Sequence, residues 1–245
     1  MKILVTGKNG FIAKNVIEFF QKNNKILAIS HTDSDEVLEE YCSICDFVFH
    51  LSAVQRSTKK SDFVDGNINY TKKLIYYLKK SNNNAPILFS TSTSVDKPSL
   101  FSITKLEAEK LLREYANENN VLFYAFKLNH IFGKYGKPNY NNVVSTFCYN
   151  IANDKPIYLS DPNNKITITY IDDLIEQFNE IVQIQPRLCN VKYIYCDKQV
   201  EISLGQLSNL IKKIKYNNCN KSNILEYNMM ITYQYFKNHC EENIK

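Results

Sequence analysis

The chain has 245 residues and a formal net charge of +5, and apolar residues make up 44% of it. This length can bury a sizeable core but is short for two independent domains. No apolar run approaches the ~20 residues that a membrane-spanning helix requires. A strand-like run, Lys2–Thr6, begins at once and leaves no room for a secretory leader, and the seven scattered cysteines form no disulfide framework. We therefore expect a cytoplasmic protein with no membrane partner.

The positive charge comes from lysines that alternate with acidic residues and asparagines instead of forming a stripe. Binding to nucleic acid requires basic residues that are clustered along the path of the phosphates, so no nucleic-acid partner is predicted. An accessory protein that binds nucleic acid through these lysines is the weakest of the functional hypotheses. A solvated surface is the favoured interpretation of these lysines, and an anionic substrate comes next.

The first two thirds of the sequence alternate short β-branched or aromatic runs with amphipathic helical patterns. Such runs are typical of strands buried in a parallel sheet, and their alternation with helices predicts an α/β fold with a doubly wound Rossmann sheet. Ligands of such sheets bind at the carboxyl ends of the strands. The predicted strands are Lys2–Val5, Lys25–Ile29, Phe47–Leu51, Pro86–Ser90 and Val121–Lys127, and the predicted helices are Phe11–Lys22, Asp35–Cys42, Phe63–Lys80 and Phe101–Asn119.

The composition changes after Gly133, where a polar loop rich in turn formers, Gly133–Asn141, replaces the strand and helix patterns. The sequence ends in two further helical patterns, Ser203–Ile214 and Asn223–Cys240. We predict an NADP-binding Rossmann domain over residues 1–130. A small C-terminal cap that binds substrate is predicted over 131–245, interleaved with the same fold.

The last helix of the first part has an amphipathic pattern that bears on the site. Its apolar stripe is formed by Ile103, Leu106, Leu111, Leu112 and Tyr115, whereas Lys105, Glu109 and Arg113 lie on another face.

A turn that contains two of the six glycines follows the first predicted strand. Gly7 permits the tight turn, Gly10 lets the backbone approach a pyrophosphate, and Ala13 lets the helix pack close to the strand. The phosphates would then bind at the helix N-terminus, where free N–H groups and the helix dipole favour anions. A plain strand-turn-helix is the alternative, but the position of the motif favours a dinucleotide. The predicted cofactor contacts in this turn are Gly7, Lys8, Asn9, Gly10, Phe11 and Ile12.

The end of the second predicted strand bears on the choice of cofactor. An NAD site usually has an acidic residue there to hold the ribose 2′-hydroxyl, and none occurs before Asp33. Because Ser30, His31 and Thr32 can donate hydrogen bonds and Lys8 can approach a phosphate, we favour NADP(H), although His31 is equally consistent with a surface histidine. The small residues at the exit of the third strand, where a cofactor can lie flat, are predicted contacts as Leu51, Ser52 and Ala53.

Several motifs fall in the order found in the extended short-chain dehydrogenase/reductases, the NAD-dependent epimerase/dehydratase family, which this chain resembles. A Ser-Thr-Ser run follows the fourth predicted strand, as it does in that family. The other motifs are TGxxGxxA at Thr6–Ala13, DxxxHLSA at Asp46–Ala53, Asn67 with Thr71 four residues later, and Tyr170–Asp173.

Three segments narrow the resemblance to the CapF-type reductases of bacterial capsule synthesis, and it extends over nearly the whole chain. They are Phe132–Lys134, Lys137–Asn141 and Ser145–Tyr149. Those enzymes are NADPH-dependent reductases of UDP-linked 4-keto-6-deoxy-2-acetamido sugars, so the resemblance implies NADP(H) as cofactor and a UDP-sugar as substrate. They also carry a C-terminal cupin domain that epimerises the sugar. This chain stops before any such domain, so epimerisation is not carried over. We also expect a homodimer.

The resemblance places the catalytic centre at the start of the helix predicted over Phe101–Asn119. The family uses Tyr-x-x-x-Lys: the tyrosine donates a proton to the carbonyl oxygen as hydride arrives, and the lysine lowers the tyrosine pKa and holds the nicotinamide ribose. Here Lys105 is present, and Ser92 or Thr93 can orient the carbonyl. The tyrosine position holds Phe101, which has no proton to give.

The loss of this general acid, which is typically worth ~10²–10⁴ in rate, leaves several interpretations open. The chain is a slow enzyme, a non-catalytic cofactor-binding protein, an enzyme with another proton donor, or one changed to trap its substrate. A core phenylalanine at a helix start is the structural alternative, but the register of Phe101 with Lys105 argues against coincidence. The candidate donors are Tyr140, Tyr135, His130, Thr93 and a bound water.

Two more positions differ from the family pattern. Lys127 stands where an arginine is usual and His130 where an asparagine is usual, and both are predicted to contact the cofactor. A structural histidine with its hydrogen bonds satisfied is an equally good interpretation of His130. For the loop residues, a solvated surface is the alternative that composition alone favours. The predicted substrate contacts are Gln55, Arg56, Asn67, His130, Lys137, Asn139, Tyr140 and Asn141.

We predict no metal site, because the CxxC spacing at Cys42–Cys45 has no second ligand pair at a suitable distance. The leading hypothesis is an NADPH-dependent reductase that acts on the 4-keto group of a UDP-linked 6-deoxy, 2-acetamido hexulose. The alternatives are a catalytically impaired cofactor-binding protein and a related nucleotide-sugar epimerase or dehydratase.

Overall fold

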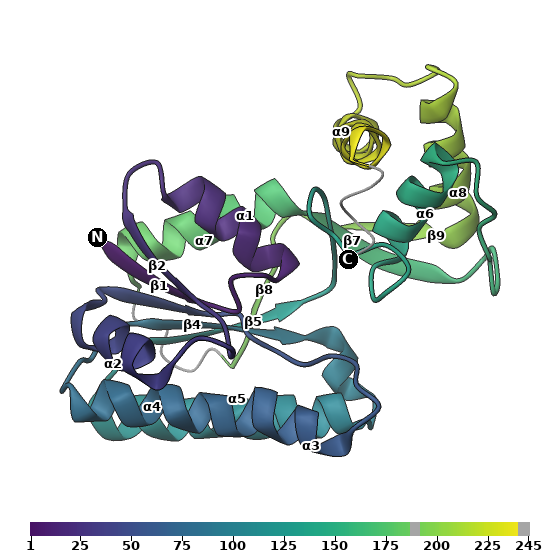
Figure 1. Ribbon diagram of the computed structural model, residues 1–245. Coiled ribbons are helices and arrows are strands. Elements are labelled where there is room, and N and C mark those ends of the chain that lie inside the picture. Colours follow the sequence, from purple (N-terminus) through teal and green to yellow (C-terminus); the bar gives the residue numbers. More distant parts are fainter. Residues whose placement is uncertain (187–191, 240–245) are drawn as a thin grey trace. The chain divides into compact units, whose positions relative to one another are not determined.

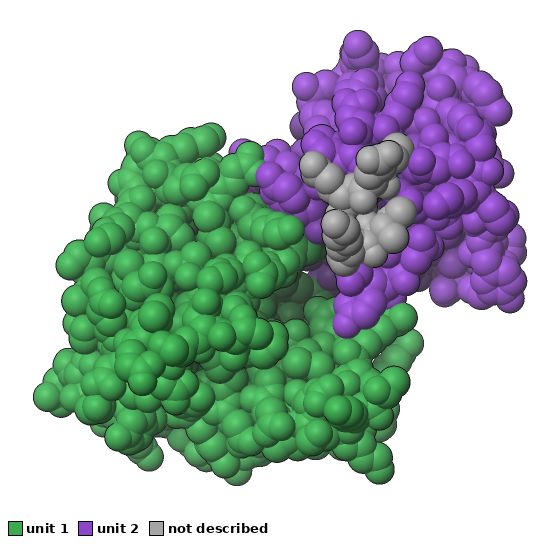
Figure 2. Space-filling view, viewed as in Figure 1, with its two compact units in different colours: residues 1–128, 177–196 green, residues 129–176, 197–245 purple. Residues whose placement is uncertain are grey.

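The computed structural model describes residues 1–186 and 192–239 (Figure 1). The chain forms two compact units, of which unit 1 comprises residues 1–128 and 177–196 and unit 2 comprises 129–176 and 197–245 (Figure 2). Residues 177–196 thus belong to the same unit as the N-terminal part, whereas the sequence places them in the cap region. The binding roles predicted for the two parts stay predictions.

Unit 1 is built on a six-stranded parallel sheet with the order β2-β1-β3-β4-β5-β8. The predicted doubly wound α/β fold of Rossmann type is confirmed. The chain leaves β1 toward β2 on one side and places β3 on the other, so the topological switch point lies beside β1. The strands are β1 (Lys2–Thr6), β2 (Lys25–Ile29), β3 (Phe47–His50), β4 (Ile87–Ser92), β5 (Phe123–Leu128) and β8 (Ile194–Tyr195).

Helices cover both faces of this sheet (Figure 1). On one face, α1 (Phe11–Phe20) and the part of α7 (Ile171–Ile184) that belongs to unit 1 pack on the strands through aromatic rings. The ring centroids of Phe49 and Phe178 are 5.6 Å apart, and Phe20 lies 5.3 Å from Phe49. Such tilted ring contacts add to the burial of apolar area.

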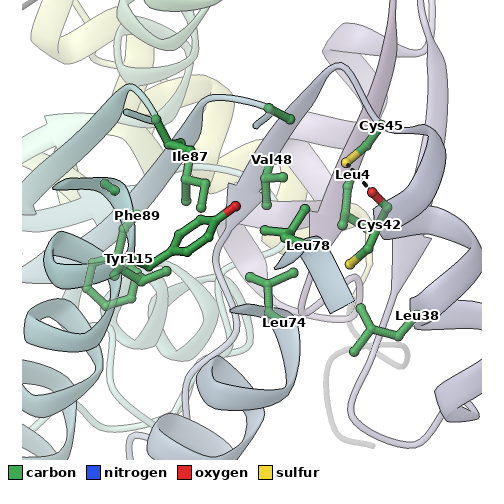
Figure 3. Packing of buried hydrophobic residues seen from close by; sticks show 14 of the residues in the cluster. Leu4, Leu38, Cys42, Cys45, Val48, Leu74, Leu78, Ile87, Phe89 and Tyr115 are labelled. Carbon is green, nitrogen blue, oxygen red and sulfur yellow. Dashed lines mark hydrogen bonds between the residues drawn. The ribbon is translucent and has the colours of Figure 1, made fainter. Parts of the chain in front are cut away.

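The other face is covered by α2 (Asp35–Ile44), α4 (Tyr70–Lys80) and α5 (Leu100–Asn119). Leucines of α2 and α4 pack against Leu4, Val48 and Ile87 of the strands (Figure 3). The thiols at the CxxC spacing belong to this core as free cysteines, and burial raises the pKa of Cys45 to about 12. Within residues 1–186 and 192–239, no three His, Cys, Asp or Glu side chains form a metal-binding group.

The helix predicted over Phe63–Lys80 is interrupted. It begins as α3 (Lys60–Phe63), continues as the π-helical turn η1 (Val64–Asn69) and becomes α4 only at Tyr70. A Cβ atom on Gly66 in η1 would lie 2.3 Å from Cγ2 of Val54, so glycine allows the turn to approach the loop after β3. Turns of this kind are frequent at functional sites.

Helix α5 begins at Leu100 with a capping box. The Ser99 hydroxyl accepts from the Ser102 amide at 3.0 Å, and the Ser99 amide donates to the Ser102 hydroxyl at 2.7 Å. The amphipathic pattern of the sequence gives the wrong buried face for two residues, because Ile103 is 62% exposed and Leu106 is 40% exposed. Lys105 and Glu109 lie on the buried side instead.

The described residues of unit 2 form a small mixed sheet, the start of α7 and three further helices. Strand β6 (His130–Phe132) pairs in parallel with β7 (Lys165–Tyr170), and β9 (Val200–Ser203) pairs antiparallel to β7. The two predicted C-terminal helices are present, capped at Ser203 and Asn223, and the predicted end at Cys240 lies outside the described residues. The helices are α6 (Val143–Ala152), α8 (Leu204–Lys215) and α9 (Ile224–Asn238).

Among the helices of the described residues, none has both the length and the apolar character needed to cross a membrane.

Candidate active site

The turn between β1 and α1 has the geometry of a phosphate cradle. Gly7 has φ +73°, and a Cβ atom on it would lie 2.8 Å from the Ser52 Cα, so only glycine fits between β1 and the exit of β3. Gly10 starts α1 in an extended conformation with no side-chain cap, and the first turn contains no acidic residue. The amides of Lys8 and Gly10 donate to the Ile29 and Gly7 carbonyls, and the uncapped N–H groups of the first turn of α1 are the ones that can bind an anion. Ala13 is buried, as close packing of α1 on the sheet requires.

An acidic residue, Asp33, lies at the end of β2, although it follows the strand by several positions in the sequence. The Asp33 carboxylate folds back and accepts from the Ser30 amide at 2.6 Å and from the Ser30 hydroxyl at 3.0 Å. Lys8 donates to both of its oxygens, at 2.8 and 2.9 Å. These contacts, the lysine first, lower the pKa of Asp33 to about 2. The absence of an acid at this strand end, which supported NADP(H) in the sequence, does not hold in the structure.

Five other predicted contacts lie around this strand end and turn. Asn9, His31 and Thr32 are exposed, and the Thr32 hydroxyl lies 2.8 Å from that of Ser30. Phe11 and Ile12, in the first turn of α1, are half-buried.

A buried polar network fixes the exit of β3 beside Gly7. The Thr6 hydroxyl accepts from the amides of Leu51 and Ser52 at 3.2 Å each and lies 2.9 Å from Nδ1 of His50. Nε2 of the same ring lies 2.8 Å from the Thr71 hydroxyl. Burial, together with the charge of Lys105, lowers the pKa of His50 to about 3, so the ring is neutral. The network holds the segment Leu51–Ala53 in register with the glycine turn.

Asn67, a predicted substrate contact, has another set of partners. It is 2% exposed, its oxygen accepts from the Val54 amide at 2.7 Å, and its nitrogen donates to the Val54 carbonyl and to the Thr104 hydroxyl. Both N–H donors of the amide and one acceptor position of its oxygen are used inside unit 1. This geometry differs from a direct substrate contact and suits the positioning of the loop after β3, in which the predicted contacts Gln55 and Arg56 lie exposed.

Lys105 is the most unusual charge of unit 1. Its side chain is almost entirely buried, and its Nζ lies 3.9 Å from the centroid of the Phe89 ring. In the described part of the chain, no carboxylate lies within ion-pairing distance of this ammonium. Burial lowers the pKa of Lys105 to about 7, and Glu109 partly opposes that shift. A buried cation without a counter-charge is costly, which is typical of a site that binds a ligand.

The other residues of the predicted catalytic centre are Phe101, Ser92 and Thr93, which precede Lys105 in the sequence. Phe101 is half-buried in the first turn of α5, one helical turn before Lys105. Ser92 ends β4, and its hydroxyl lies 2.7 Å from that of Ser94. Thr93 is exposed and starts the short 3₁₀ turn η2 (Thr93–Asp96). Ser92 and Thr93 therefore lie at the carboxyl edge of the sheet, where ligands of this fold bind.

Lys127, predicted to contact the cofactor, is held inside the protein. Its Nζ lies 2.7 Å from Oδ1 of Asp96, and this hydrogen bond raises the pKa of Lys127. The same ammonium lies 4.9 Å from the centroid of the Tyr193 ring. The pair ties β5 to η2 and so supports the segment that follows Ser92.

In unit 2, hydrogen bonds connect the predicted substrate loop to α6. Tyr135 and Asn139 both adopt left-handed backbone conformations, with φ of 68° and 55°. The Asn139 amide donates to the Thr146 hydroxyl at 2.9 Å, and Asn142 caps α6 through the Ser145 amide. Strained conformations of this kind persist where surrounding contacts impose them. The predicted contacts His130, Lys137, Asn139, Tyr140 and Asn141 are all exposed.

The comparison with known families decides the classification. Residues 3–186 match the model of the NAD dependent epimerase/dehydratase family. The chain belongs to this family. It is 32% identical over 210 residues to a UDP-2-acetamido-2,6-beta-L-arabino-hexul-4-ose reductase of Pseudomonas aeruginosa, a match that covers 85% of this chain and 56% of the relative.

Solved structures agree with the fold. A crystal structure of the capsular polysaccharide assembling protein CapF from Staphylococcus aureus has a TM-score of 0.85 and 29% identity, and the match covers 96% of this chain and 66% of that one. A UDP-glucuronic acid 4-epimerase from Bacillus cereus in complex with NAD has a TM-score of 0.81 at 18% identity, over 97% and 99% of the two chains. The present chain spans about half the length of the curated relatives that it matches.

Proposed function

We propose that the chain catalyses the NADPH-dependent reduction of the 4-keto group of a UDP-linked 6-deoxy-2-acetamido hexulose. The observation that carries the proposal is the 32% identity to a reductase of such a 4-keto sugar. The glycine turn and the buried Lys105 support it, because both suit a bound dinucleotide. The family itself is described as NAD dependent, and the choice of NADP(H) rests on the Lys8 ammonium of the glycine turn and on the Ser30 and Thr32 hydroxyls at the end of β2.

The residues of unit 1 fit a nicotinamide dinucleotide. The space beside Gly7 that a Cβ atom would fill, and the uncapped start of α1, suit a pyrophosphate. Lys105 would hold the nicotinamide ribose through hydrogen bonds that its buried ammonium lacks in the described part of the chain. When bound, the cofactor supplies the hydride. Ser92 would orient the keto oxygen by donating a hydrogen bond.

The proton that completes the reduction cannot come from Phe101. Lys105 lies one helical turn further along α5, and its pKa of about 7 lets it release a proton near neutral pH. We propose that Lys105 supplies the proton, directly or through a bound water, in addition to holding the ribose. The exposed Tyr140 and His130 of unit 2 are the alternative donors.

The test is the oxidation of NADPH by the purified chain in the presence of UDP-linked 4-keto-6-deoxy sugars, followed by absorbance. Turnover that is abolished in Lys105→Met but retained in Tyr140→Phe and His130→Gln would support the proposal. The proposal fails if the wild type does not oxidise NADPH with any such sugar while Phe101→Tyr does. In that case the natural chain is impaired in catalysis.

Phe101 itself favours a second candidate function, a cofactor-binding protein without turnover. This hypothesis predicts tight binding of NADP(H) by calorimetry and no oxidation of NADPH by either the wild type or Phe101→Tyr. A related nucleotide-sugar epimerase or dehydratase is distinguished by its product, because such an enzyme isomerises or dehydrates a UDP-sugar without net consumption of NADPH.

We extend the proposal to a homodimer formed through α5. Leu100, Ile103 and Leu106 are 41%, 62% and 40% exposed and follow one another at helical spacing on the outer side of α5. A second copy of the chain would cover this apolar face. Sedimentation equilibrium tests it: the wild type is expected to be a dimer and Ile103→Glu with Leu106→Glu a folded monomer, and a monomeric wild type would refute it.

A further inference from the structure

Three charged side chains follow one another at intervals of one helical turn along one side of α5. Lys105, Glu109 and Arg113 are each four residues apart, so neighbouring members of the row lie close on the helix surface. Lys105 is 3% exposed and Glu109 is 4% exposed, whereas the side chain of Arg113 is 31% exposed. The proposed reaction uses only the lysine of this row.

Arg113 holds the Glu109 carboxylate at the outer end of the row. Nε of Arg113 donates to Oε1 of Glu109 at 2.9 Å, and its Nη2 donates to the Lys192 carbonyl. The guanidinium carbon also lies 5.2 Å from the centroid of the Phe123 ring and 5.6 Å from that of Tyr193. These contacts fix the arginine, and the arginine in turn fixes the carboxylate beside the helix.

The second oxygen of the Glu109 carboxylate lacks such a partner. Oε2 of Glu109 is buried, and within residues 1–186 and 192–239 no group forms a hydrogen bond with it. An oxygen of this kind is costly, because it has left water without full compensation, and such costs are typical of functional sites. Burial and then the charge of Glu109 raise the pKa of Tyr193, so this charge acts on the groups around it.

Lys105 is also within the influence of the Glu109 charge. Burial lowers the pKa of Lys105 to about 7, and the charge of Glu109 opposes that shift. The two side chains form no ion pair, so the carboxylate acts on the ammonium through its charge and not through a direct bond. Charges act over longer distances in the protein interior than in water, because the interior is less polar.

The other elements packed against α5 have no described carboxylate that is available to Lys105. His50 of β3 is neutral, β4 presents the Phe89 ring, and the lysines of α3 and α4 are at least partly exposed. The carboxylates of these elements have partners elsewhere: Asp62 of α3 accepts from Ser57, Asp65 of η1 from Asn69, and Asp96 of η2 from Lys127 of β5.

We propose that Glu109, fixed by Arg113, is a positioning residue that keeps the Lys105 ammonium charged in its buried site. The face of the Phe89 ring supports the ammonium by a cation–π contact, and Glu109 adds a full negative charge one helical turn away. The inference rests on the proposed role of Lys105 as ribose ligand and proton donor. It adds the residue that determines how much of this lysine is protonated near neutral pH.

The experiment follows the ionisation of Lys105 in the free protein, so that it does not depend on turnover. NMR of protein labelled with ¹³C-lysine is recorded from about pH 5 to about pH 9, and Lys105→Met identifies the resonance. Glu109→Gln removes the charge but can still accept from Arg113, whereas Glu109→Asp keeps the charge. The matched control is Glu114→Gln, which removes the acid of the exposed pair with Lys110 at the same spacing. Melting temperatures show that each variant is folded.

In Glu109→Gln the pKa of Lys105 is expected to fall by about 1, which leaves about tenfold less ammonium above neutral pH. Glu109→Asp and Glu114→Gln should stay close to the wild type. Because aspartate changes the packing more than glutamine does, this pair of variants separates the loss of charge from a loss of packing. The alkaline limb of the pH profile of NADPH oxidation should move to lower pH by the same amount in Glu109→Gln.

An unchanged pKa of Lys105 in Glu109→Gln would overturn the inference. A fall in Glu109→Asp as large as the one expected for Glu109→Gln would also overturn it, and this outcome decides the question even if the glutamine variant does not fold. NADPH oxidation with an unchanged pKa in Glu109→Gln would leave the proposed reaction standing. The expected fall without oxidation of NADPH by the wild type would overturn only the proposed reaction.

Discussion

Two regions of unit 1 contain a lysine near the predicted dinucleotide site, and the surroundings of the two charges differ. One is Lys8 in the glycine turn, and the other is Lys105 near the start of α5. Lys8 is partly exposed and has a carboxylate partner with two further hydrogen bonds. Lys105 is buried against the Phe89 ring and forms no ion pair in the described part of the chain. The Lys8 charge is thus balanced by a carboxylate, whereas the Lys105 charge is buried without one in the described part of the chain. Substitutions should therefore affect the two regions differently.

The largest expected effect concerns the residue one turn before Lys105. If α5 lacks only a phenol, Phe101→Tyr should raise kcat for the reduction of a UDP-4-keto sugar by ~10²-fold, within the usual range for a general acid. The dissociation constant of NADPH should change little. Steady-state kinetics and calorimetry check both, with Phe101→Leu as the matched control. An unchanged kcat in Phe101→Tyr would show that the natural chain already has an efficient donor.

The next effect is on stability. Because the pKa of Lys105 lies near 7 in the folded chain and near 10.5 in the unfolded one, the unfolded chain binds more protons between these values. The free energy of unfolding of the wild type should therefore rise as pH increases from about 7 to about 10.5, and the cost of the buried charge is complete below about 7. Lys105→Met should abolish this rise and stabilise the free protein by ~2–4 kcal/mol at neutral pH.

Urea unfolding across this pH range measures the effect of Lys105→Met, and the exposed Lys110→Met on the same helix serves as control. Equal stability of Lys105→Met and the wild type at pH 7 would mean that water or an unrecognised group already solvates the ammonium. Lys105→Met should also lose binding of NADPH, so the variant would be more stable than the wild type but unable to bind the cofactor.

In the glycine turn, we expect backbone geometry to determine the effect of a substitution on stability. Gly7→Ala should lower the free energy of unfolding by ~1–3 kcal/mol, because the left-handed φ is strained for alanine and its Cβ would collide with the Ser52 backbone. Denaturant titration provides the measurement. Gly10→Ala, whose φ is −75° and whose Cβ would lie 3.1 Å from the Gly7 carbonyl oxygen, is the milder comparison. Equal losses in the two variants would contradict the special role of Gly7.

The smallest expected effect is the pH dependence due to the Lys8–Asp33 pair. The pKa of Asp33 is lowered from 3.8 to about 2, so its contribution to stability is present above about pH 4 and is lost as pH falls through about 2. Asp33→Asn should therefore flatten this part of the acid unfolding curve slightly, since the pair is partly exposed. Acid titration followed by circular dichroism measures the slope. A steeper slope in Asp33→Asn would show that the pair destabilises the fold.

Several features could be predicted from the sequence because they depend on local patterns. The alternation of buried strands and helices predicts the doubly wound sheet, and the glycines after β1 predict the turn that Gly7 forms against Ser52. The Phe101–Lys105 register depends only on helical spacing, and the structure places both residues in the first two turns of α5.

The features that the sequence did not predict were decided by tertiary structure, because they depend on contacts that a local pattern does not contain. Asp33 reaches the end of β2 only because the chain turns back so that its carboxylate meets Ser30 and Lys8. Periodicity assigned Ile103 to the buried face of α5, but the side of the helix that is buried is the one with Lys105. A hydrophobic pattern records which residues are apolar, and only packing determines which side of α5 is covered.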